Sequence, residues 1–194
     1  MHASSSSPAR NRPRRLVPGL VLGALVLGVA GVGLAGGCSG TPPQPDKPAG
    51  KPIDVGAFEV TVRDTLVMTD RLDRNQRFLA VRMRVVNKGR ESAALGAGGL
   101  RFGLVGRTRD GKWVNPDDVE AVAAGSKIYE VHPGLPVEAT AKWRMGPADA
   151  PRRFVLGLRE WEHGPGFTDT DIRWRADTED GRLAARVTLA VTGS

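Results

Sequence analysis

Hydrophobic and polar residues alternate along much of the chain after residue 56. The last such segment places hydrophobic residues at every second position: Leu183, Ala185, Val187 and Leu189. The same period of two recurs in four earlier segments, 58–62, 81–85, 141–145 and 172–174. Strict alternation is typical of a strand that turns one face to a core and the other to water. These segments therefore predict strands.

Turn-forming residues separate these segments. Turns are expected at Asn87-Lys88-Gly89, Asp110-Gly111, His132-Pro133-Gly134, Gly164-Pro165-Gly166 and Asp180-Gly181. Further strands are expected near Leu100–Gly106, Ser126–Val131 and Phe154–Trp161. Only Asn115–Ala124 favours a short helix, because Pro116 suits the first helical position and the acidic pair that follows suits the first turn.

Seven to nine short strands with frequent turns predict an all-β fold, an immunoglobulin-like antiparallel β-sandwich. Tryptophan side chains bury large apolar areas, so we expect four of them to fill much of the core. They are Trp113, Trp143, Trp161 and Trp174. The sandwich is expected to span residues 56–194.

The N-terminal part has a different pattern. A basic patch of four arginines, Arg10, Arg12, Arg14 and Arg15, precedes an uncharged run from Leu16 to Gly37. As a helix this run would be roughly 33 Å long, enough to cross a bilayer. A basic region, an apolar region and a small-residue exit are typical of a signal peptide. Because Cys38 follows directly, the segment resembles a bacterial lipoprotein signal, in which Cys38 becomes the lipidated first residue.

Two alternatives remain for this segment, an uncleaved N-terminal anchor helix and an ordinary secretory signal with an incidental cysteine. Lipoprotein signals prefer leucine three residues before the cysteine, whereas this chain has Ala35 there and its leucine at position 34. Pro18 and several glycines disfavour a permanent membrane helix, which favours cleavage. All three alternatives place the domain on the extracytoplasmic side, and the first makes it a cell-membrane lipoprotein.

Residues 38–55 are rich in proline and predict a semi-rigid spacer between the signal (1–37) and the sandwich. The whole chain has a net charge of +7, from 28 basic and 21 acidic residues. Without the four arginines of the signal the net charge falls to +3. This small excess gives little support to nucleic-acid binding.

Three stretches of the first half, FEVTV, RFLAVRMRVVNKG and LRFGLVGRTRDGKW, resemble the immunoglobulin-like domain of the DUF4352 type found in Gram-positive lipoproteins. Asn87 and Asp110-Gly111 match that family's turns. The second half, with VHPGLPVEATAKWRM, IRWRAD and LAARVTLAV, resembles uncharacterised exported actinobacterial proteins. The resemblance implies the fold and brings no catalytic residues with it.

Candidate catalytic residues are few. His132 and His163 both precede turn sequences, and Cys38 is the only cysteine, so neither a nucleophilic triad nor a zinc site is expected. An acidic cluster, Asp169, Asp171, Asp177, Glu179 and Asp180, could bind calcium but also suits plain turns. Glu160 and Glu162 would share a strand face, which is the basis of an enzyme hypothesis. We expect no enzyme activity, cofactor or metal.

Pairs of cations alternate with the hydrophobic residues of three predicted strands. They are Arg82 and Arg84, Lys142 and Arg144, and Arg173 and Arg175. If these strands are neighbours, six cations line one sheet face and could bind anionic lipid headgroups or an anionic wall polymer. The alternative is that they only keep an exposed sheet soluble and protect its edges.

Together these features predict a non-catalytic, lipid-anchored binding domain of the bacterial cell envelope. Its partners would be the membrane, through the anchor, and an envelope protein or an anionic wall polymer. Two alternative functions remain: an enzyme acting on the cell wall or on glycans through Glu160 and Glu162, and a passive subunit of a membrane complex.

Overall fold

The computed structural model describes residues 45–70, 73, 75–123, 125–146, 149–165, 170–178 and 182–193. Residues 43–194 form one compact unit. The expected signal and Cys38 lie outside the described residues. Within these ranges, no helix has the length and hydrophobicity needed to span a bilayer.

The described residues form strands and one short helix, α2 (Leu100–Gly103). The first seven strands are β1 (Pro52–Asp54), β2 (Phe58–Thr69), β3 (Arg77–Asn87), β4 (Ala93–Ala94), β5 (Leu104–Arg107), β6 (Trp113–Val114) and β7 (Asp118–Ala123). The others are β8 (Ser126–Ile128), β9 (Glu130–Val131), β10 (Pro136–Met145), β11 (Arg153–Arg159), β12 (Trp161–Gly164), β13 (Arg173–Ala176) and β14 (Leu183–Thr192).

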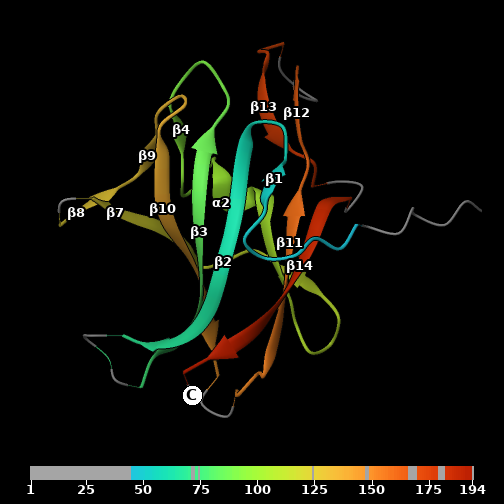
Figure 1. Cartoon of the computed structure of the whole chain (residues 1–194). Helices are drawn as coiled ribbons and strands as arrows, with labels where there is room; N and C mark the ends of the chain where they lie inside the picture. The colour runs from blue at the N-terminus through green and yellow to red at the C-terminus, as the bar shows by residue number, and fades with distance from the viewer. Residues whose placement is uncertain are drawn as a thin grey trace, which may run out of the picture. The chain divides into compact units, whose positions relative to one another are not determined.

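One large sheet contains most of these strands, in the order β6-β5-β11-β14-β2-β3-β10-β7-β8, with β1 added beside β2. The sheet curls, so that β2, β3 and β10 form one layer and β5, β11 and β14 the other (Figure 1). Neighbours are antiparallel except where β14 pairs with β2 in parallel, at Val191–Thr65 and Thr192–Leu66. The all-β immunoglobulin-like sandwich expected from the sequence is confirmed, with this parallel junction as its one departure from antiparallel pairing among the sheet's described strands.

The core lies between the two layers and follows the predicted alternation. On β3 the side chains of Val81, Met83 and Val85 are fully buried, whereas Arg82 and Arg84 point to solvent. The equivalent inward positions of β2 and β14 are also buried. Burial of these apolar side chains drives the two layers together, at roughly 25 cal/mol per Å² removed from water.

The sandwich begins earlier than residue 56. Asp46 forms a parallel bridge with Arg186 of β14, and β1 then pairs with β2. The side chains of Ile53 and Val55 are buried in the core cluster. Residues 45–55 were expected in the spacer, but they cover the seam between β2 and β14 and pair with both strands. Burial of the apolar side chains of Ile53 and Val55 stabilises this position.

Two local expectations are wrong. Residues 118–123 form β7 instead of a helix, because β7 pairs with β10 and buries Val119 and Ala121 on alternate positions. Residues 100–103 form α2 instead of a strand. Asn115 explains this turn of helix, since its Nδ2 donates hydrogen bonds to carbonyls of residues 101, 102 and 104. Tertiary partners outweigh local propensity in both places.

The third difference concerns the predicted strand around residue 174. β13 pairs with β12 in a separate two-stranded sheet that projects from one end of the sandwich (Figure 1). Ile172 is 68% exposed and Trp174 is 37% exposed, so neither fills the core. Trp143 and Trp161 are buried as expected.

Candidate functional site

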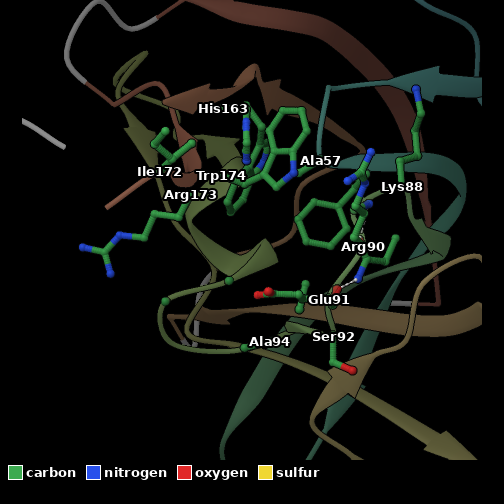
Figure 2. Close-up of a pocket in the computed structure, with 17 residues that line it drawn as sticks. Ala57, Lys88, Arg90, Glu91, Ser92, Ala94, His163, Ile172, Arg173 and Trp174 are labelled. Carbon is green, nitrogen blue, oxygen red and sulfur yellow. Dashed lines mark hydrogen bonds between the residues drawn. The ribbon is translucent and has the colours of Figure 1, made fainter. Parts of the chain in front are cut away.

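A groove with a volume of about 830 Å³ lies beside the projecting β12–β13 sheet. Its other wall is the connection between β3 and β4, residues 88–92, together with Gly98 and Gly99. Figure 2 shows Ile172 and Trp174 on one side of the groove and Glu91 and Ser92 on the other. The volume is within the roughly 300–1,000 Å³ typical of ligand sites.

Two aromatic rings form the floor. Phe58 and Trp161 pack edge to face, with their centroids 5.2 Å apart. The backbone amide of Trp161 donates to the carbonyl of Val55 over 2.7 Å, which ties the floor to the N-terminal segment. Gly56 follows with φ +96°, and a Cβ there would lie 2.3 Å from the Trp161 carbonyl oxygen. Only glycine therefore fits this position.

Asn87 fixes the loop that forms the opposite wall. Its side chain is buried, and its Nδ2 donates to the carbonyls of Glu91 (2.7 Å) and Val131 (2.9 Å). Its Oδ1 accepts from the amide of Gly89 over 2.8 Å. These three bonds tie residues 89 and 91 of the groove wall to the end of β3 and to Val131 of β9.

The rim nearest β13 is apolar and aromatic. The indole of Trp174 lies beside the imidazole of His163, with their centroids 5.0 Å apart and the planes at 50°. Ile172, two residues earlier, is exposed at the same rim. A half-exposed indole next to an exposed isoleucine offers a contact surface, since tryptophan is among the residues most enriched where proteins bind partners.

Cations outnumber anions along the groove, with Lys88, Arg90 and Arg173 against Glu91. Lys88 is paired with Asp54, and a hydrogen bond from Lys88 lowers the pKa of that carboxyl. Arg173 extends away from the middle of the groove (Figure 2). No ion pair of Arg90 is found within the described ranges, so Arg90 is the cation best placed to meet a ligand.

A serine and a histidine meet at the edge of the same wall. Ser92 Oγ lies 2.6 Å from His132 Nδ1, and both side chains are exposed. No carboxylate hydrogen-bonded to His132 is found in the part of the chain that the structure describes. The pair therefore links residue 92 to the 131–134 turn and supplies a hydroxyl to the groove wall.

The structure separates the six predicted cations. β3 and β10 are neighbours, so Arg82, Arg84, Lys142 and Arg144 share one outer face. β13 belongs to another sheet, so Arg173 and Arg175 do not join them. Arg175 instead lies against the backbone carbonyl of Gly164 on β12.

Acidic side chains are interleaved with the cations of the outer face. Arg82 forms a two-point ion pair with Asp64, and Lys142 pairs with Glu120. Partial burial works to raise the pKa of Glu120, but hydrogen bonds from Lys142 and Lys127 outweigh it and lower that pKa. This face is a network of opposite charges and offers an anionic ligand less than the groove does.

The remaining candidates lie apart from the groove. Glu160 connects β11 to β12, and Glu162 is an exposed residue of β12 facing Arg182. Neither lines the groove or a second hollow of about 750 Å³ near Trp143 and Phe154. No cluster of three or more metal-binding side chains is found among the described residues. Asp169, Glu179 and Asp180 of the acidic cluster lie outside them.

Sequence reasoning did not identify the groove. It placed Trp174 and Ile172 in the core because they alternate with charged residues. A usable signal was present, since that strand is short and follows a segment rich in glycine, threonine and aspartate, which is typical of a projecting hairpin. No sequence pattern distinguished Arg90 as a candidate binding residue.

Comparison with known proteins gives little further information. No family model matches the chain, and no curated protein matches it. An uncharacterised β-sandwich protein of Clostridium difficile is similar in structure, with 9% identity and a TM-score of 0.47 over 78% of this chain and 97% of that one. The yjhA protein of Bacillus subtilis has 14% identity and a TM-score of 0.37 over 75% and 98%. Both scores are too low to support a fold or a function, so membership of the DUF4352 family stays a prediction.

Proposed function

We propose that this chain is a non-catalytic, lipid-anchored binding module on the extracytoplasmic face of the bacterial cell membrane. The groove beside β13 is its binding site. The observation behind the proposal is the combination at that groove of an exposed indole, an exposed isoleucine and Arg90 on a wall fixed by Asn87. The anchor itself is inferred from the signal-like sequence that ends at Cys38.

The short distance between anchor and fold supports a role close to the membrane. Seven peptide steps separate Cys38 from Pro45, whose carbonyl already bonds to Arg186 of the sandwich. At about 3.3–3.6 Å per residue the connection reaches at most about 25 Å. A lipidated Cys38 would therefore keep the groove within the envelope layer next to the membrane.

Two experiments test the proposal. Intact-mass analysis of membrane-extracted protein should show a diacylglycerol-sized addition in the wild type. The Cys38→Ala variant should lack this addition and should no longer be retained in the membrane fraction. Equal mass and retention in both would disprove the lipid anchor.

The binding role is tested with the full chain in detergent micelles and isolated envelope fractions. Arg90→Ala and Trp174→Ala should reduce binding to the envelope material, whereas Arg84→Ala, an exposed cation of the outer sheet face, should not. Undiminished binding by both groove variants, or no binding by the wild type, would refute the groove as a binding site.

A further inference from the structure

Building on the proposed function, we infer that the groove binds an acidic carbohydrate, a chain of sugar rings bearing carboxylate or phosphate groups. Three properties of the groove determine this ligand class. They are an aromatic surface at the rim, a cation on the opposite wall, and mixed hydrogen-bonding groups on that same wall.

The aromatic surface suits the face of a sugar ring. Trp174 is held by packing against His163 yet keeps 37% of its surface exposed. One face of a pyranose ring presents C–H groups, whose positive edges pack against the negative π-face of an indole. Ile172 extends the apolar rim beside it. A flexible acidic peptide without rings gains much less from such a flat surface.

Arg90 supplies the charge that the ligand must complement. A guanidinium binds carboxylate or phosphate through two parallel hydrogen bonds, which gives direction as well as attraction. Lys88 is engaged with Asp54, so Arg90 is the cation of this wall that has no ion pair among the described residues. A neutral glycan would leave this charge without a partner.

Glu91 and Ser92 narrow the choice of ligand class further. Both line the groove on the same wall as Arg90. A carboxylate accepts hydrogen bonds from hydroxyl groups and repels anions, so Glu91 favours a ligand that presents hydroxyls as well as negative charge. Poly-L-glutamate, which has carboxylates but no hydroxyls, does not meet this requirement, whereas an acidic glycan does.

The test uses the full chain in detergent micelles and follows binding by tryptophan fluorescence and calorimetry. The probes are oligogalacturonate, phosphomannan, neutral dextran and poly-L-glutamate. Oligogalacturonate or phosphomannan should bind, dextran should not, and poly-L-glutamate should bind at least tenfold more weakly than the acidic glycan. Arg90→Ala and Trp174→Phe should each weaken glycan binding about tenfold, and Arg84→Ala should leave it unchanged.

Each outcome decides the proposal. Failure of both acidic glycans, equal binding of poly-L-glutamate, or insensitivity to both groove substitutions would overturn it. Arg90 is exposed and makes no ion pair within the described ranges, so its loss does not threaten folding. If the acidic glycans fail while envelope fractions still bind through Arg90 and Trp174, the proposed function survives and only the ligand class is wrong.

Discussion

Replacing Asn87 by alanine removes three buried or half-buried hydrogen bonds at the junction of β3 and the groove wall. Each such bond contributes a net 0.5–1.5 kcal/mol or so, and a buried carbonyl left without a partner costs about 1–3 kcal/mol. The hydrogen bond to the carbonyl of Val131 is buried, whereas those to Glu91 and Gly89 are part-buried. Asn87→Ala should therefore reduce the free energy of unfolding by about 2–4 kcal/mol.

Asn87→Asp is a sharper form of the same test, because it keeps the shape and the acceptor for Gly89. It replaces the donor by an oxygen that faces the carbonyls of Glu91 and Val131. Ionisation at this site is unfavourable, so the pKa of the new carboxyl is raised above about 3.9. The variant should be most stable at low pH and lose stability relative to wild type as the pH rises through that raised pKa.

Urea unfolding of residues 43–194, followed by tryptophan fluorescence, measures both effects. Asn75→Ala, in an exposed turn, is the matched control and should change stability by less than about 0.5 kcal/mol. A loss below about 1 kcal/mol for Asn87→Ala would refute the role given to its hydrogen bonds. So would a penalty for Asn87→Asp that does not change between pH 4 and pH 7.

Three further predictions concern the fold. A Cβ at Gly103 would lie 2.4 Å from an indole nitrogen in the core, so Gly103→Ala should cost about 1–3 kcal/mol in urea unfolding, whereas Gly96→Ala, with open space around it, should be neutral. The lowered pKa of Glu120 means that Glu120→Gln should lose about 1–2 kcal/mol at pH 7. The difference from wild type should shrink as the pH falls below the ordinary value of 4.5 and vanish once the pH has fallen through the lowered pKa of the folded state. Deleting residues 45–55 should lower the urea midpoint strongly, and an unchanged midpoint would contradict their place in the core.

The sequence allowed much of the sandwich to be predicted, because its long strands bury every second side chain. The alternation around Met83 and around Val187 needs no knowledge of partners to be interpreted. The short elements could not be predicted from alternation alone. Val119 lies in a strand because β10 offers an edge to pair with, and Leu100 lies in a turn of helix that Asn115 stabilises from another segment. Contacts between segments far apart in the chain decide such cases.

The candidate site was harder to predict for the same reason. A strand with charged and apolar residues in alternation has the same pattern whether its apolar side enters a core or borders a groove. Trp174 is at the rim because, among the described strands, β13 pairs with β12 in a separate sheet and not with the large one. That pairing also separated the six predicted cations. Asp64 and Glu120, which form ion pairs with Arg82 and Lys142, lie on two other strands and share no sequence pattern with them.

The segment that covers the seam between β2 and β14 also determines how the protein responds to mechanical load. In a protein held by its N-terminus, tension enters at Asp46, which is attached to Arg186 by an ion pair and two flanking backbone hydrogen bonds. These few bonds break before β1 is pulled from β2. Their release frees residues 45–49, at most roughly 17 Å of extended chain, while Gly50 stays bonded to Val62 and the two layers stay closed. Under load, this segment would therefore detach first and lengthen the connection to the N-terminus, while the sandwich stays folded.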